Sequence, residues 1–125
     1  MRLPITGDYP PYWPQLAEAV KKAAGGKCIR CGHVHDPAAG YSLTVHHLDG
    51  HKGNDYWWNL LALCQRCHLH VQGIVIPERP WLFEHSEWFK PYVAGFYAKK
   101  YLNEDLDRTA TLARMDALLA LECLA

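Results

Sequence analysis

Apolar residues first recur with helical spacing near the N-terminus, after a lead-in rich in proline and aromatic residues. Leu16, Val20 and Ala23 fall on one face of a helix predicted over residues 15–24. The glycine pair at 25–26 predicts the end of this helix, because glycine readily adopts the left-handed conformation that ends helices. An N-terminal helix of about ten residues is therefore expected before the first cysteine.

The central stretch is predicted to form two strands and a short helix. Residues 42–47 alternate and are rich in β-prone side chains, whereas 60–63 form a short apolar run that suits a returning strand. Residues 49–55 contain Gly50, Gly53 and Asn54, which favour an irregular loop between the strands. Residues 65–72 are expected to be helical and to end at Gly73.

Two further helices are expected in the C-terminal third. Pro91 suits the first turn of a helix that runs to about Leu102. Asp107 suits the cap of a last helix, which is expected to reach about Glu122. The apolar positions of this last helix form a broad stripe that would pack on the domain or on a second copy of the chain: Leu112, Met115, Leu118, Leu119 and Leu121.

An aromatic stripe is expected on the first of these helices only if it extends back through Pro91. Trp88, Tyr92 and Phe96 would then share one face. Such a stripe can stack nucleic-acid bases. Aromatic side chains are more often part of a core, so we interpret the three as core residues.

Length and composition suit one globular domain. The chain has 125 residues, half of them hydrophobic, and no apolar run long enough for a bilayer. The N-terminus lacks an apolar signal core, so a cytoplasmic protein is expected. We expect an α+β fold with three parts: a lead-in and helix at 1–26, a core at 27–73 and a helical extension at 74–125.

The net charge of zero conceals an uneven distribution. Residues 1–34 carry a net +3, residues 35–80 a net −1 and residues 81–125 a net −2. The basic side chains of the first third are Lys21, Lys22, Lys27 and Arg30, besides Arg2. Because neutralisation of phosphates supplies most of the affinity for DNA, any DNA binding by this chain alone is expected to be weak and salt-sensitive.

Four of the five cysteines form two Cys-x-x-Cys pairs, Cys28 with Cys31 and Cys64 with Cys67. In a reducing compartment this pattern favours a metal over disulfides. Four thiolates complete a tetrahedral zinc site, which leaves no coordination position open and predicts a structural role. Cys123 lies outside the pattern and is interpreted as a buried or incidental thiol.

Histidines gather beside these cysteines. His46 and His47 end the first predicted strand, and His68 directly follows Cys67. Adjacent strand residues point to opposite faces, so His46 and His47 must have different roles. One of them could bind a divalent metal together with His68, and the other could face a water molecule beside that metal. Hydrolysis of a phosphodiester requires both an activated water and neutralisation of charge. We interpret the remaining candidates, His33, His35 and His85, as hydrogen-bonded bystanders.

The runs Leu-Thr-Val-His-His-Leu-Asp-Gly at 43–50 and Asn-Leu-Leu-Ala-Leu-Cys-Gln-Arg-Cys-His at 59–68 resemble the HNH endonucleases. These proteins belong to the ββα-metal superfamily, and the resemblance is to the members in which two Cys-x-x-Cys pairs hold a structural zinc. It covers residues 27–73, and small phage and bacterial HNH proteins carry flanks like those on either side.

The resemblance implies a role for each residue of the motif. His47 would be the general base, His46 and His68 would hold a catalytic divalent ion such as Mg²⁺, Mn²⁺ or Ni²⁺, and Asn59 would pin the loop that orients His47. The products would carry 5′-phosphate and 3′-hydroxyl ends. The chain departs from the family at Gln72, one helical turn after His68, where relatives often have His or Asn. Its carbonyl is a weak ligand, and His70 faces elsewhere on the helix.

Three functions remain open on this basis. The first is a metal-dependent DNA endonuclease, associated with a phage or mobile element and aided by a protein partner or by homodimerisation. The second is a zinc-stabilised adaptor that has lost catalysis, which Gln72 and the neutral charge favour. The third, a bare zinc ribbon, leaves the adjacent histidines unexplained. Retention of His46, His47, Asn59 and His68 together favours the endonuclease.

Overall fold

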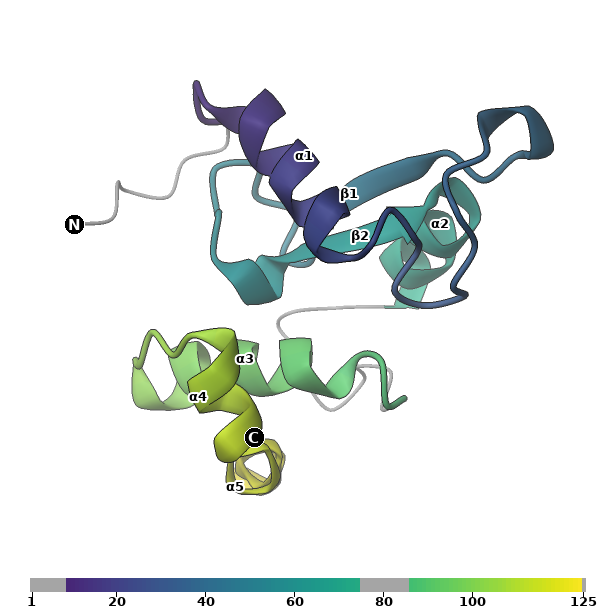
Figure 1. Ribbon diagram of the computed structural model, residues 1–125. Coiled ribbons are helices and arrows are strands. Elements are labelled where there is room, and N and C mark those ends of the chain that lie inside the picture. Colours follow the sequence, from purple (N-terminus) through teal and green to yellow (C-terminus); the bar gives the residue numbers. More distant parts are fainter. Residues whose placement is uncertain (1–8, 75–85, 125) are drawn as a thin grey trace. The chain divides into compact units, whose positions relative to one another are not determined.

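A computed structural model describes residues 9–74 and 86–124, and the chain divides into two compact units, 1–73 and 74–125, which we treat separately. The elements confirm an α+β fold with a two-stranded antiparallel sheet and several helices (Figure 1). The boundary between the units coincides with the expected end of the core. The single-domain organisation stays a prediction.

The first unit is a β-hairpin between two helices. Strand β1 (Leu43–His47) pairs with β2 (Leu60–Cys64), so that Leu43 lies opposite Cys64 and His47 opposite Leu60. Because side chains alternate along a strand, Thr44 and His46 face one side of the hairpin, and Val45 and His47 face the other. Helix α2 (Gln65–Ile74) contacts the first side and helix α1 (Trp13–Ala23) the second.

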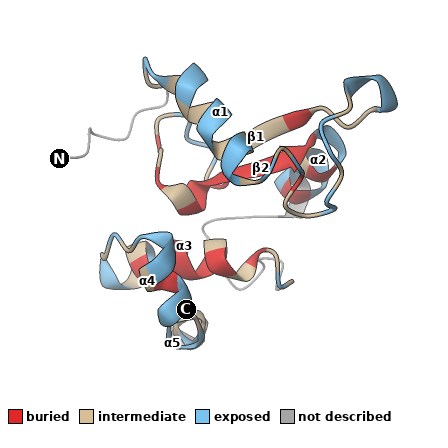
Figure 2. Cartoon of the chain, viewed as in Figure 1, coloured by how far each residue is buried: buried red, intermediate tan, exposed pale blue. Residues whose placement is uncertain are grey.

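Burial follows this arrangement. Strand β2 is buried along its whole length, as Figure 2 shows, because both of its faces are covered. The buried residues of this unit include Leu61, Leu63 and Val71, none of which is measurably exposed. A loop and the 3-10 turn Trp57–Asn59 lie between the strands, and another 3-10 turn, Pro37–Ala39, precedes β1.

Two helix boundaries in the first unit differ from the sequence-based prediction. Helix α1 begins at Trp13 rather than at residue 15, since Pro14 fits the first turn of a helix, where its missing N–H is not needed. It ends as predicted at two glycines, both with positive φ. Helix α2 does not stop before Gly73 but continues to Ile74, so the prediction that Gly73 ends it is wrong.

The second unit consists of helices. Helix α3 (Lys90–Leu102) has the predicted bounds within one residue, and Asn103 ends it in the left-handed conformation. Helix α4 (Arg108–Ala113), helix α5 (Met115–Leu119) and a 3-10 turn (Ala120–Leu124) follow. Ala94, Ala98 and Leu118 form a buried cluster, against which apolar side chains from the later helices pack.

The single last helix predicted over residues 107–122 is wrong in its continuity. Asp107 does cap α4, since its Oδ1 accepts the Ala110 amide at 2.7 Å, but the helix breaks at Arg114. Because of the break, the predicted apolar stripe of the last helix is not buried as one continuous face. Leu118 is buried, whereas Leu112 is 45% exposed. Trp88 precedes α3 and stacks on Phe89, so the three-aromatic stripe does not form on the helix.

Some expectations fall outside the described residues. His85 lies there, and the side chain of Cys123 is also outside the described part. Within the described ranges, no helix is both long and apolar enough to cross a membrane.

Candidate metal centre and nuclease site

The four predicted cysteines come together at one point of the first unit. Their Sγ atoms all lie within 4.8 Å of one another, and the Sγ atoms of Cys31 and Cys64 are 3.8 Å apart. A tetrahedron with Zn–S bonds of ~2.3 Å places its sulfur atoms ~3.8 Å apart. The donor set and its spacing therefore fit zinc.

The backbone holds these thiols in two similar turns. The amide of Cys31 donates to the Sγ of Cys28 at 3.4 Å, and the amide of Cys67 donates to the Sγ of Cys64 at 3.5 Å. In the first turn Gly32 adopts a φ of +80°, a conformation that would be strained for a residue with a side chain. The amide of Ile29 also donates to the carbonyl of Ala62, which ties this turn to β2.

The protein environment acts differently on the individual thiols of the cluster. Burial raises the pKa of Cys67 to about 12, although the Arg30 guanidinium, with Nη1 3.5 Å from that sulfur, opposes the shift. Burial also acts to raise the pKa of Cys28, but backbone hydrogen bonds outweigh it and bring the value to about 7. A bound cation, whose charge favours thiolates, would offset the effect of burial on Cys67.

The structure also brings together the two predicted ligands of a catalytic ion. The ring of His46, on β1, lies 4.6 Å from the ring of His68, on α2, measured between centroids. His46 is 7% exposed, and its Nε2 is buried without a hydrogen-bond partner among the described residues. A buried ring nitrogen of this kind is costly unless a hydrogen-bond partner or a metal meets it.

The tautomer of His68 follows from its contact with Thr44. The Thr44 hydroxyl donates its only proton to the carbonyl of Leu63 at 2.7 Å, and it lies 2.9 Å from the Nδ1 of His68. The hydroxyl oxygen must then accept a hydrogen bond from the Nδ1–H of His68, which leaves the Nε2 lone pair of His68 available. A ring oriented through its second nitrogen is the usual arrangement of a metal-binding histidine.

All three site histidines are held neutral. Burial lowers the pKa of His46 to about 4, and proximity to His68 and His47 adds to the shift. Burial likewise lowers the pKa of His47, with Asp49 opposing, and lowers the pKa of His68. Neutral imidazoles can bind a cation or accept a proton at pH 7, whereas imidazolium can do neither.

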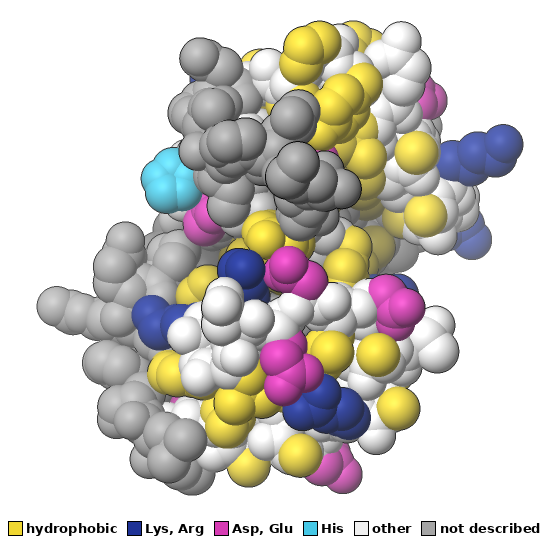
Figure 3. Space-filling view, turned by 90° about the vertical axis from the view of Figure 1, so that its left-hand side faces the viewer, with side chains coloured by type: hydrophobic (Ala, Val, Ile, Leu, Met, Phe, Trp, Pro, Cys, Tyr) yellow, Lys and Arg dark blue, Asp and Glu magenta, His cyan; other side chains and the backbone are white. Residues whose placement is uncertain are grey.

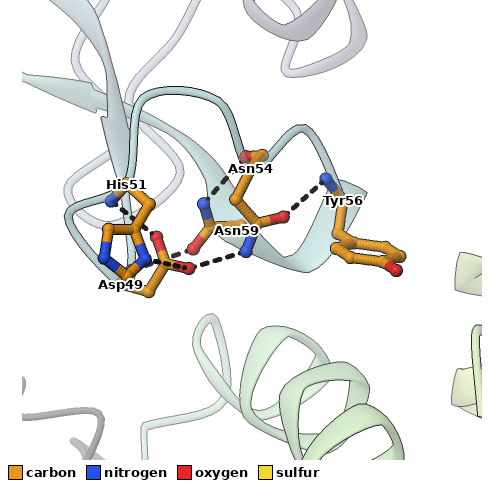
Figure 4. A network of polar contacts seen from close by, with 5 residues as sticks. All are labelled: Asp49, His51, Asn54, Tyr56 and Asn59. Carbon is orange, nitrogen blue, oxygen red and sulfur yellow. Dashed lines mark hydrogen bonds and ion pairs between the residues drawn. The ribbon is translucent and has the colours of Figure 1, made fainter. Parts of the chain in front are cut away.

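Asn59 joins the two ends of the loop between the strands (Figure 4). It has no measurable exposure. Its Oδ1 accepts the Asp49 amide and its Nδ2 donates to the Asn54 carbonyl, both at 2.9 Å. Its backbone carbonyl accepts the Leu48 amide. One side chain therefore fixes the chain immediately after His47.

The same loop contains a second set of polar contacts, centred on Asp49. The carboxylate accepts Asn54 Nδ2 at 2.6 Å and the His51 amide at 2.8 Å, and the His51 ring lies 3.4 Å away. Asn54 in turn accepts the Tyr56 amide. His51 is therefore turned to Asp49, within the loop (Figure 4).

His47 lies on the α1 side of the hairpin, under aromatic side chains. Its ring centroid is 4.8 Å from that of Trp13 and 5.8 Å from that of Tyr9. The side chain is 8% exposed, and its Nε2 is buried with no hydrogen-bond partner among the described residues. The Nε2 atom of the candidate base is therefore not accessible to solvent in this conformation.

The remaining candidates lie apart from the histidine pair or are used elsewhere. Among residues 9–74 and 86–124, no third His, Cys, Asp or Glu joins His46 and His68 in a cluster. Gln72 is exposed on α2, one turn after His68, and His70 is exposed as well. His35 accepts the Leu43 amide at 2.9 Å, and His33 stacks on Tyr41.

The predicted basic region is partly committed to other contacts. Arg30 contacts the zinc-site sulfur, and Lys21 pairs with Glu18 at 4.0 Å. On the face drawn in Figure 3, the described Lys and Arg side chains are interspersed with Asp and Glu and form no continuous basic area.

Sequence reasoning assigned no role to Thr44, Asp49, Asn54 or Trp13. The first three are polar residues within or next to the motif, so their position was a signal for Asp49 and Asn54. Thr44 lies two residues before His46, on the same face of β1, which was also readable from strand alternation. The contact of Trp13 with His47 joins distant segments and had no sequence signal.

Comparison with known families agrees with this geometry. Residues 28–72 match the family model described as HNH endonuclease. No curated protein and no solved structure matches the chain significantly. The matched segment contains all four clustered cysteines together with His46, His47, Asn59 and His68. Residues 28–72 are therefore similar to the HNH endonuclease family, and the four cysteines within them fit a zinc site.

Proposed function

We propose that this protein is a metal-dependent endonuclease that hydrolyses phosphodiester bonds in DNA. The observation that carries the proposal is the approach of His46 and His68 to 4.6 Å, from a strand and a helix, within the segment that matches the HNH family. His47, next in the chain, is a neutral imidazole on the same strand. A structural zinc domain alone has no need of this arrangement.

The mechanism assigns separate tasks to the histidines. A divalent cation held by His46 and His68 would neutralise the scissile phosphate and stabilise the departing oxygen. The lone pair of His47 takes a proton from a water molecule while the water oxygen bonds to phosphorus. The bond from phosphorus to the 3′ oxygen breaks, and that oxygen takes a proton from solvent. The products carry a 5′-phosphate and a 3′-hydroxyl.

The other residues of the site support this reaction through position. Thr44 fixes the His68 tautomer that presents Nε2. Asn59 anchors the loop after His47 and thereby limits the motion of the base. Zinc bound by the four cysteines would hold β2 and the start of α2 against the turn that contains Cys28 and Cys31, so that His68 meets His46.

The proposal is tested by incubating the zinc-loaded protein with supercoiled plasmid at low and moderate salt. Parallel reactions contain Mg²⁺, Mn²⁺, Ni²⁺ or EDTA. We expect nicking or linearisation with a divalent cation and none with EDTA, and product ends that accept ligation without prior phosphorylation. Absence of cleavage under every metal, from folded zinc-loaded protein, would contradict the proposal.

A second function has a specific observation in its favour. The Nε2 of His47 is buried, and no third acidic, cysteine or histidine ligand joins His46 and His68 among the described residues. A zinc-stabilised adaptor that binds nucleic acid or protein would be compatible with both features. The same plasmid assay separates the functions, because an adaptor shifts DNA mobility or binds a partner without cutting.

A further inference from the structure

We infer that residues 9–13 form a cover over His47 that must move aside before cleavage. This inference rests on the proposed function, because it concerns access to the base of that reaction. The cover lies before the segment that matches the HNH family. It would keep the nuclease in a resting state and make opening of residues 9–13 a step of the catalytic cycle.

The contact itself blocks the chemistry that His47 would perform. A general base must come within about 3 Å of the water that it deprotonates. The Nε2 of His47 is buried and has no hydrogen-bond partner among the described residues. The rings of Trp13 and Tyr9 contact the His47 ring. A water and a phosphodiester can reach this atom only if the aromatic cover is displaced.

Contacts at the surface hold the cover in place. The Tyr12 hydroxyl donates to Asp55 Oδ2 at 2.5 Å, which links the cover to the loop between β1 and β2. The Nζ of Lys52, in the same loop, lies 5.0 Å from the Tyr9 ring centroid. Tyr9 and Tyr12 are 49% and 41% exposed, so these contacts are made largely in water. Surface contacts of this kind open at modest cost.

Opening need not disturb the metal pair. Trp13 and Tyr9 contact His47 on the α1 side of the hairpin, whereas His46 meets His68 on the α2 side. Tyr12 and Asp55 belong to neither the cysteine cluster nor the histidine pair. The cover can therefore be weakened by substitution while both metal centres are left intact.

The first test loosens the link without touching His47. Tyr12→Phe and Asp55→Asn each remove or weaken the same hydrogen bond, and the double variant should add little to either. Loss of this hydrogen bond is expected to raise the population of the open state by roughly 2- to 10-fold. Where opening limits the reaction, the single-turnover cleavage rate should rise by the same factor. Tyr101→Phe and Asp105→Asn, in the second unit, are matched controls and should leave the rate unchanged.

The second test measures the exposure of His47 without any cleavage. Diethyl pyrocarbonate modifies accessible neutral imidazoles, and mass spectrometry of the modified peptide gives a rate for each histidine. His51, with a 66% exposed side chain, provides the internal reference. We expect His47 to react far more slowly than His51 in the wild type, and faster in Tyr12→Phe, Asp55→Asn and Trp13→Leu.

The two readouts distinguish the possible failures. Equal labelling rates of His47 and His51 in the wild type would contradict the cover. Variants in which His47 is labelled faster but DNA is cleaved more slowly would also contradict it, because the aromatic residues would then position the base. Unchanged cleavage and labelling in all three variants would also overturn it. A wild type that never cuts DNA would contradict the proposed function, while the labelling would still decide whether the cover exists.

Discussion

The Nδ1 atom of His68 lies 2.9 Å from the hydroxyl of Thr44, which donates its hydrogen bond to the carbonyl of Leu63. This relationship fixes the proton of His68 on Nδ1 and leaves Nε2 free. It links a strand residue with no evident chemistry to the orientation of a candidate metal ligand. Most of the testable consequences of the site follow from such supporting contacts.

Thr44→Val keeps the shape of the side chain but removes the hydroxyl that orients His68. We expect the divalent cation concentration for half-maximal cleavage to rise by roughly 10- to 100-fold, the usual cost of losing an outer-shell partner. Thr44→Ser retains the hydroxyl and serves as the control. A Thr44→Val protein with unchanged metal dependence would show that the contact does not orient a ligand.

Gln72→His places an imidazole one helical turn after His68, on the same face of α2. We expect tighter binding of the catalytic cation, with half-maximal cleavage at a concentration lower by on the order of tenfold, equivalent to about 1.4 kcal/mol of binding free energy. Leu69→His is the control, because position 69 lies about 100° around the helix from position 68. Equal effects of both variants would contradict a ligand position at 72.

Asn59→Ala removes the side chain that joins Asp49 to Asn54. Two buried backbone groups lose their partner, so we expect the free energy of unfolding to fall by roughly 2–4 kcal/mol. Cleavage should fall as well, because the loop after His47 loses its anchor. Urea denaturation and single-turnover rates measured below the unfolding transition check both effects. Full stability would show that Asn59 does not anchor the loop.

Cys64→Ser should remove zinc and unfold the first unit, since binding of a structural metal is coupled to folding. Circular dichroism and the zinc content of the purified protein measure the outcome. Cys123→Ser, outside the clustered cysteines, should keep one zinc per chain and the wild-type spectrum. A folded Cys64→Ser protein with a full complement of zinc would refute the four-thiolate site.

The sequence was a good guide to the hairpin and to the clustering of the four cysteines. Strand alternation before His47 and the two Cys-x-x-Cys spacings are local signals, and the structure places Cys28, Cys31, Cys64 and Cys67 together as predicted. Alternation alone left open which of His46 and His47 faces His68, and only the resemblance to the HNH endonucleases implied His46, whose ring the structure places 4.6 Å from that of His68.

Contacts between distant segments were beyond such reasoning. The contact of Trp13 with His47 depends on how α1 crosses the hairpin, and no periodicity in either segment encodes that crossing. The break at Arg114 was missed because residues 108–122 have good helical spacing, and only packing against α3 favours two short helices over one. Gly73 was misread as an end because glycine tolerates a helix interior at a cost of about 1 kcal/mol.

The most direct measurement of the central claim compares cleavage rates of the wild type and His47→Ala, both zinc-loaded, under single-turnover conditions in Mn²⁺. His70→Ala, an exposed histidine on α2, is the matched control. We predict that His47→Ala loses at least about 100-fold in rate, the range expected for a general base, with its zinc content and stability retained, and that His70→Ala cleaves like the wild type. A His47→Ala protein that cuts DNA at the wild-type rate would contradict the assignment of His47 as the base.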